Sequence, residues 1–231
     1  MQEKNKIQLS TQNSTCIVIS GTEGSGVTHT IKSICQNQQS EKGKTLYLST
    51  TYFSSEQLLP INRKKLLHEL SQCTLLAIDN LHNWYKIKKR AVDFLITLSY
   101  FCLQRKTTLL LGCSDEKKDI TRSTEFGAAT QHSRIRLKNP SYGEAVSLLK
   151  FLCEYENNIP KNIPEEIASF NGTYQQYINC LIHIRFQSKI KGVNLFALSK
   201  KERSEIFGLK YFFTQSQLRK AFIREWCEFN R

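Results

Sequence analysis

The sequence predicts an α/β protein in which a doubly wound parallel sheet is followed by a smaller helical domain. Up to residue 137, short apolar runs alternate with amphipathic segments, a pattern typical of βα units around a parallel sheet. From Pro140 onward the hydrophobic periodicity is helical only. We therefore expect a flexible polar tail over residues 1–14, an α/β domain over 15–145 and a helical domain over 146–231.

The α/β domain should contain five strands, three of them almost continuously apolar, as expected of strands buried on both faces. The segment SRIRL instead alternates apolar and basic residues, which is typical of an edge strand. The expected strands are 16–20, 44–49, 74–80, 107–115 and 133–137. The expected helices between them are 27–38, 63–72 and 88–104.

The second domain should consist of helices. Ser141 with Glu144 three residues later forms a capping-box pattern, which predicts a helix start at Ser141. The expected helices are 141–155, 163–170, 173–186 and 214–226.

The loop GTEGSGVTHT (21–30) joins the first strand to the first helix and has the spacing of a phosphate-binding loop, GxxxxGK[ST]. Val27 stands where the lysine of that motif is expected. Backbone amides and the helix dipole bind phosphate without a lysine. The loop therefore either binds a nucleotide weakly, favouring a diphosphate, or stays empty and only caps the helix. The candidate nucleotide-binding residues are Gly21, Thr22, Glu23, Gly24, Ser25, Gly26, Val27, Thr28 and His29.

Asp79 ends a buried strand at the edge of the sheet where α/β proteins bind ligands. Thr28 and Asp79 could together hold Mg²⁺ if a nucleotide is bound, which requires them to lie within about 10 Å of each other. The alternative is a strand-end acid that only accepts hydrogen bonds from loop amides. We expect His29 to pack or to brace the loop rather than to catalyse.

This order of motifs resembles the AAA+ ATPase domain of the replication initiator DnaA, and more closely the DnaA-related regulators of the Hda branch. The resemblance rests on GxxGxGxTH after a strand, on AIDN, and on RLKNPS before a helix, and it covers residues 15 to 225. It implies a P-loop AAA+ fold with a small C-terminal helical lid. It also implies a degenerate Walker A motif over 21–29, Walker B residues Asp79 and Asn80, and a sensor-1 residue, Ser114, whose alternative role is to cap the strand end.

The sequence departs from this family's pattern at several points. Besides Val27, Asn80 replaces the acid that activates water in many AAA+ proteins. The sensor-2 arginine and the Ser-Arg finger are missing at their usual places, although Arg122 and Arg134 lie near the latter. The resemblance therefore implies an adaptor or regulator of replication initiation that contacts an AAA+ initiator, with at most weak ADP or ATP binding and little or no hydrolysis.

Two other hypotheses stay open. The first is a working ATPase with a lysine supplied by Lys32 or Lys44. The second is a DNA-binding or helicase-loading accessory protein, because a net charge of +13 favours polyanionic partners unless it only solvates the surface. Aromatics interleaved with cations can grip nucleic acid. The candidate contacts are Trp84, Lys86, Lys88, Lys89 and Arg90, although Trp84 could simply anchor the helix start.

The tail carries Gln8 and Leu9, which resemble the short peptide by which Hda-like proteins dock into the sliding clamp. The alternative is a disordered tail. The eight cysteines form no CxxC pair, and the N-terminus lacks an apolar signal segment, so we expect a cytoplasmic protein with reduced thiols and no zinc. No apolar run is long enough to suggest a membrane span.

Overall fold

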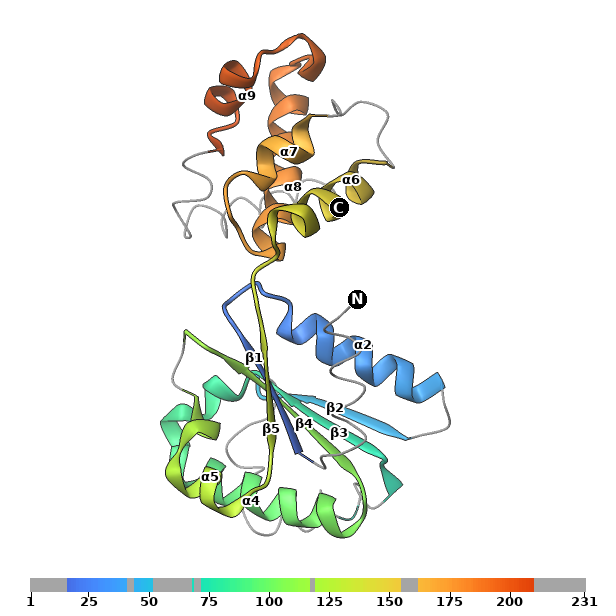
Figure 1. The fold of residues 1–231 in the computed structure, drawn as a ribbon, viewed down its shortest axis with the longest axis vertical. Coiled ribbons are helices and arrows are strands. Elements are labelled where there is room, and N and C mark those ends of the chain that lie inside the picture. The colour runs from blue at the N-terminus through green and yellow to red at the C-terminus, as the bar shows by residue number, and fades with distance from the viewer. Residues whose placement is uncertain are drawn as a thin grey trace. The chain divides into compact units, whose positions relative to one another are not determined.

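The computed structural model describes residues 16–40, 44–51, 68, 72–116, 119–154 and 162–209. The chain divides into two compact units, Met1–Lys138 and Asn139–Arg231 (Figure 1). The boundary expected between residues 145 and 146 falls inside helix α6 (Tyr142–Glu154), which belongs to the second unit. The clamp-like peptide at Gln8 and Leu9, most of the helix expected over 63–72, and the helix expected over 214–226 lie outside the described residues.

A five-stranded parallel sheet forms the centre of the first unit, with the strand order β2-β3-β4-β1-β5. The strands are β1 (Cys16–Gly21), β2 (Thr45–Ser49), β3 (Leu75–Asp79), β4 (Thr108–Ser114) and β5 (Ser133–Leu137). Among the described strands, β5 pairs with β1 alone, which confirms the predicted edge strand.

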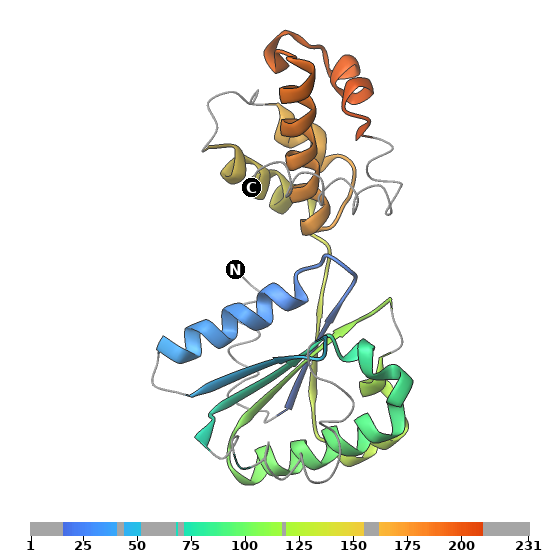
Figure 2. The ribbon, with the colours of Figure 1, turned by 180° about the vertical axis from the view of Figure 1, so that it is seen from behind.

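Helices cover both faces of this sheet, which confirms the predicted doubly wound α/β fold. Helix α2 (Val27–Ser40) lies on one face, and α4 (Lys88–Gln104) and α5 (Thr124–Ala129) lie on the other, as the two opposite views show (Figures 1 and 2). Short 3-10 helices, η3 (Leu81–Ile87) and η4 (Ile120–Arg122), connect β3 to α4 and β4 to α5.

Two hydrophobic clusters fill the space between the sheet and its helices. On strand β1, Ile17 and Ile19 join Ile31 of α2 in one cluster, while Val18 packs with the α4 cluster on the opposite face. All four side chains are fully buried, and burial of each contributes roughly 1.5–3 kcal/mol. Burial also raises the pKa of the Cys16 thiol to about 12, so this cysteine stays protonated and packs as a small apolar group.

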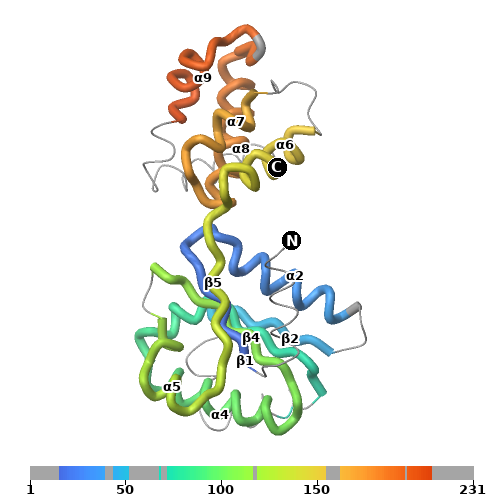
Figure 3. The backbone as a smooth tube through the Cα atoms, viewed as in Figure 1, coloured from blue at the N-terminus to red at the C-terminus, as the bar shows by residue number. Residues whose placement is uncertain are grey.

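The second unit is helical in its described part, as predicted (Figure 3). Its elements are α6 (Tyr142–Glu154), α7 (Ile163–Ala168), α8 (Tyr174–Lys191), η5 (Leu195–Ala197) and α9 (Lys200–Ile206). The predicted capping box is confirmed: the Ser141 amide donates to Glu144 Oε2 at 2.9 Å, and the Glu144 amide donates to Ser141 Oγ at 3.4 Å.

A buried ion pair lies within this helical unit. Arg203 of α9 donates from Nε to Glu166 Oε2 of α7 at 3.1 Å and makes a second, shorter contact to the other carboxylate oxygen. The two side chains are only 5% and 7% exposed, so each charge depends on the other for compensation.

Among the residues that the structure describes, no helix is both long and apolar enough to span a membrane. The same residues contain no cluster of three or more His, Cys, Asp or Glu side chains that could hold a metal ion. None of the seven described cysteines takes part in a disulfide.

Candidate functional site: a phosphate-binding loop without its lysine

The loop between β1 and α2 has the backbone shape of a phosphate cradle. Gly24 and Gly26 adopt φ angles of 84° and 95°, in the left-handed region that favours glycine. The Ser25 amide closes a turn by donating to the Thr22 carbonyl at 3.0 Å, and the Thr30 amide donates to the Gly26 carbonyl at 2.8 Å as the helix begins. The first amides of α2 have no partner within the helix, as at any helix N-terminus, and so remain donors for an anion.

One buried hydroxyl of this loop lacks a hydrogen-bond partner. Ser25 is 3% exposed, and its Oγ makes no hydrogen bond to any described residue. A Cβ atom at Gly21 would lie only 2.2 Å from that oxygen, so the loop closes tightly over the end of β1 and needs glycine there. The hydroxyl therefore lies beneath the loop against Gly21, and it is an exception to the rule that buried polar atoms are hydrogen-bonded.

Val27 supplies no cation to the cradle. It is the first residue of α2, and its side chain packs against the cluster that contains Ile17 and Ile19 of β1. The loop therefore keeps its backbone donors and lacks the charged side chain that the motif's spacing calls for.

Asp79 lies at the end of β3, as the sequence predicts, but its carboxylate is enclosed. The residue is 1% exposed. Oδ1 accepts a hydrogen bond from the Asn80 amide at 2.8 Å, and Oδ2 accepts one from the Tyr47 hydroxyl at 3.0 Å. A Cβ atom on Gly112 of β4 would come within 2.3 Å of Oδ1, so the acid lies directly against the neighbouring strand. A buried carboxylate with both oxygens already engaged fits poorly as the anchor of a hydrated Mg²⁺.

Asn80 fastens the ends of two strands together. It has a left-handed φ of 62°, its side-chain amide donates to Ser49 Oγ at 3.2 Å, and its carbonyl accepts from Thr50 Oγ1 at 2.6 Å. A carboxamide in this bonded position has no basic group with which to activate water.

Ser114 ends β4 opposite Gly21 of β1. Its hydroxyl accepts from the Glu116 amide at 3.3 Å, which matches the strand-end cap that we considered as the alternative to a sensor role. The next residue, Asp115, donates its amide to the Gly21 carbonyl at 2.8 Å and so ties the β4 tip to the start of the cradle.

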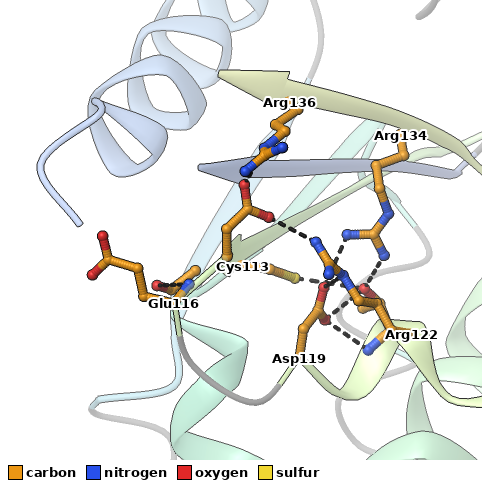
Figure 4. Close-up of polar contacts among 9 residues, drawn as sticks. Cys113, Glu116, Asp119, Arg122, Arg134 and Arg136 are labelled. Atoms are coloured by element: carbon orange, nitrogen blue, oxygen red, sulfur yellow. Dashed lines mark hydrogen bonds and ion pairs between the residues drawn. The ribbon is translucent and has the colours of Figure 1, made fainter. Parts of the chain in front are cut away.

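Figure 4 shows a network of carboxylates and arginines that follows Ser114. Asp115 is bonded by Arg122 at 2.9 Å and by Arg136 at 2.6 Å, and Asp119 by Arg134 at 2.9 Å. Burial opposes ionisation of Asp119, but hydrogen bonds from Thr121 and Arg134 outweigh it and hold the pKa of this carboxyl below its usual value. Arg122 and Arg134, the arginines nearest to the usual place of the Ser-Arg finger, are thus ion-paired within their own chain.

The structure corrects two expectations about single residues. Trp84 is 3% exposed and packs edge-on against Phe94 with ring centroids 5.9 Å apart, so the prediction that it stacks on nucleic acid is wrong. His29 is exposed on the first turn of α2, so of its two expected roles the packing role is wrong, and bracing of the loop stays a prediction. The four neighbouring cations of Trp84, namely Lys86, Lys88, Lys89 and Arg90, are all exposed.

The two lysines considered as substitutes for residue 27 lie in different places. Lys44 directly precedes β2, at the amino end of the parallel strands, and donates to Gln72 Oε1 at 3.5 Å. The cradle follows the carboxyl end of β1, so Lys44 is at the wrong edge of the sheet. Lys32 lies on α2, and its Nζ is 5.5 Å from the centroid of the Tyr47 ring.

No protein-family model matches the sequence, and no curated protein matches it. Its structure is similar to domain III of the Thermotoga maritima replication initiation protein DnaA, with a TM-score of 0.66 and 16% identity over 93% of this chain and 92% of that one. A DnaA bound to AMPPCP and single-stranded DNA gives a TM-score of 0.58 and 12% identity, covering 89% of this chain and 75% of that one. A point mutant of Thermotoga maritima RuvB gives a TM-score of 0.64 and 15% identity, covering 90% of this chain and 68% of that one.

These likenesses, together with the five-stranded parallel sheet, define the fold as that of a P-loop AAA+ domain. Within that class the fold is DnaA-like.

Proposed function

We propose that this chain is a DnaA-like AAA+ module, similar to the Hda branch, that regulates replication initiation by contacting an AAA+ initiator and does not itself hydrolyse ATP. The observation that carries this proposal is that residue 27 is a valine and not a lysine. A half-buried valine, packed against the cluster of Ile17 and Ile19, stands where a P-loop ATPase places the lysine that reaches the transferred phosphate.

Loss of the lysine affects binding and hydrolysis to different extents. A charge-assisted hydrogen bond contributes roughly 1.5–3 kcal/mol, so binding of ADP or ATP would weaken by about one to two decades and a backbone cradle could still hold it. Hydrolysis would suffer more, because positioning and charge stabilisation are nearly all that a protein contributes to phosphoryl transfer. Asn80 cannot act as a base, and Arg122 and Arg134 are engaged by Asp115 and Asp119.

A direct test of the partner is equilibrium association with the DnaA-type initiator of the same organism, measured by sedimentation with ADP or ATP present. We expect a complex whose stability depends on the nucleotide of the initiator. Absence of association in every nucleotide state would contradict the proposal. The same assay with the sliding clamp, using Gln8→Ala with Leu9→Ala as the comparison, tests the docking peptide.

DNA binding is the second candidate function, and one observation favours it. Four exposed cations gather where η3 meets α4, namely Lys86, Lys88, Lys89 and Arg90. Because Trp84 is buried, the mode of binding would be electrostatic contact with phosphates rather than base stacking.

A salt titration of DNA affinity discriminates this candidate. Charge reversal of Lys88, Lys89 and Arg90 should lower the slope of log affinity against log salt concentration by about one for each phosphate that is no longer bound. Reversal of three exposed lysines of the second unit, Lys191, Lys200 and Lys201, changes the net charge by the same amount and serves as the control. Equal reductions of affinity in both variants, or no binding at low salt, would contradict a DNA site at the start of α4.

A further inference from the structure

Lys32 occupies a position from which it can reach the cradle. It lies four residues after Thr28 on α2, so both side chains share one face of the helix. Side chains on a helix lean toward its N-terminus, which here is the loop. Lys32 is exposed, and its Nζ lies over the face of the Tyr47 ring, 5.5 Å from the ring centroid. Such an exposed cation–π contact is weak, so the ammonium can leave it for a phosphate.

Tyr47 connects this lysine to the acid of the site. Its ring lies beneath the Lys32 ammonium, and its hydroxyl donates to Asp79 Oδ2 at 3.0 Å. The Tyr47 hydroxyl and the Asn80 amide therefore already hold the two oxygens that a metal would use. The positive charge on the Asp79 side of α2 is therefore the amino group of Lys32.

The loop itself offers donors for an anion independently of Lys32. Its left-handed glycines, Gly24 and Gly26, lead into the amides that begin α2, which have no acceptor within the helix. These groups would supply hydrogen bonds to phosphate oxygens, but no positive charge beyond the helix dipole. Lys44, the other lysine near in sequence, belongs to the opposite edge of the sheet.

We infer that Lys32 supplies the cation that residue 27 lacks, so that the loop binds the polyphosphate of a nucleotide without a divalent metal. The inference rests on the proposed function, in which a nucleotide is held but not hydrolysed. In this arrangement the cradle amides bind phosphate oxygens, Lys32 neutralises their charge, and Asp79 keeps its internal hydrogen bonds. Val27 stays half-buried against the cluster of Ile17 and Ile19.

The test is equilibrium binding of ADP, ATP and pyrophosphate by calorimetry, each with excess Mg²⁺ and with EDTA. We expect EDTA to change the affinity by less than threefold, and Lys32→Met to weaken it at least tenfold. Lys44→Met removes the same charge from the other edge of the sheet and should change the affinity by less than twofold. Both lysines are exposed, so thermal unfolding should confirm that each variant is folded.

A second variant separates a specific contact from general charge. Adding Val27→Lys to Lys32→Met should restore most of the missing affinity, because the cradle regains a cation. Loss of binding in EDTA, or equal effects of Lys32→Met and Lys44→Met, would overturn the inference. So would the absence of nucleotide binding by the unmodified protein, which would leave the partner-binding proposal intact. Preference for pyrophosphate over ADP would identify an inorganic polyphosphate as the ligand and would also overturn it. ATP turnover, measured separately, would instead contradict the proposed function.

Discussion

Replacing Gly112 by alanine should destabilise the first unit, because this glycine lets Asp79 lie against β4. The new Cβ would stand 2.3 Å from Asp79 Oδ1 and 2.6 Å from Ile31 Cδ1, far inside ordinary contact. Moving Oδ1 breaks its hydrogen bond with the Asn80 amide, which costs about 1–3 kcal/mol. Crowding of Ile31 adds about 1–3 kcal/mol, and the strand preference of alanine over glycine returns about 0.5–1 kcal/mol. We expect a net loss of about 3 kcal/mol.

Urea unfolding followed by tryptophan fluorescence measures this loss. Trp84 is buried in the same unit, and a Trp226→Phe background removes the second tryptophan of the chain. Gly127→Ala is the matched control: nothing lies within 4 Å of the added Cβ in α5, so helix propensity should stabilise the protein by up to about 1 kcal/mol. A Gly112→Ala protein within about 0.5 kcal/mol of its parent would refute the close approach of Asp79 to β4.

Three further predictions concern charge. Val27→Lys should tighten nucleotide binding, measured by calorimetry, without restoring turnover, and by less than the roughly one to two decades expected of a cradle that has no cation, because Lys32 already supplies one. Glu166→Gln should lower the free energy of unfolding by about 3–5 kcal/mol because Arg203 is left buried without its partner, whereas Glu166→Leu with Arg203→Met should recover most of that loss. Since the pKa of Asp119 is lower in the folded state than in the unfolded state, its stabilising effect is complete above the unfolded pKa of about 4 and is lost as the pH falls through the folded value. Urea midpoints should therefore decrease at acid pH less steeply in Asp119→Asn than in the unmodified protein.

The strands and their parallel arrangement could be predicted because each apolar run in the sequence indicates a buried strand. The order β2-β3-β4-β1-β5 could not be predicted, since an apolar run does not indicate which strands pair with it. Helix α5 could not be predicted, because its six residues include a glycine and are too few to show helical periodicity. Its one local signal is the N-cap Ser123, whose Oγ accepts from the Phe126 amide at 3.2 Å. Helix α9 carried a readable signal that we missed: Ser199 and Glu202 form a capping box.

The candidate site was predictable in its backbone and less so in its side-chain contacts. The glycines of the loop and the strand-end position of Asp79 follow from local motifs. The partner of Asp79 does not, because Tyr47 lies 32 residues earlier in the chain and meets it only across two paired strands. Of the two roles considered for Trp84, contact with nucleic acid failed for the same reason, and its burial against Phe94 instead fits the anchoring role, which the basic sequence around it does not reveal.

The pairing of Arg122, Arg134 and Arg136 with two buried aspartates was equally hidden. These acids follow a strand tip, and the arginines come from η4 and from β5, so the network forms only once the edge strand is in place (Figure 4). The net charge of +13 already counts these two aspartates, so the network engages the arginines without reducing the surplus that favours polyanionic partners.

The proposed function requires that the loop does not catalyse ATP hydrolysis, and the most direct test of it is to measure ATP turnover by the unmodified protein. Phosphate release should be measured with and without Mg²⁺, alongside Asp79→Ala as the background. Since residue 27 supplies no charge and Asn80 no base, we expect no turnover above that background under either condition. Robust hydrolysis that requires Mg²⁺ and disappears in Asp79→Ala would show that the site is a working ATPase, and would contradict the proposed function.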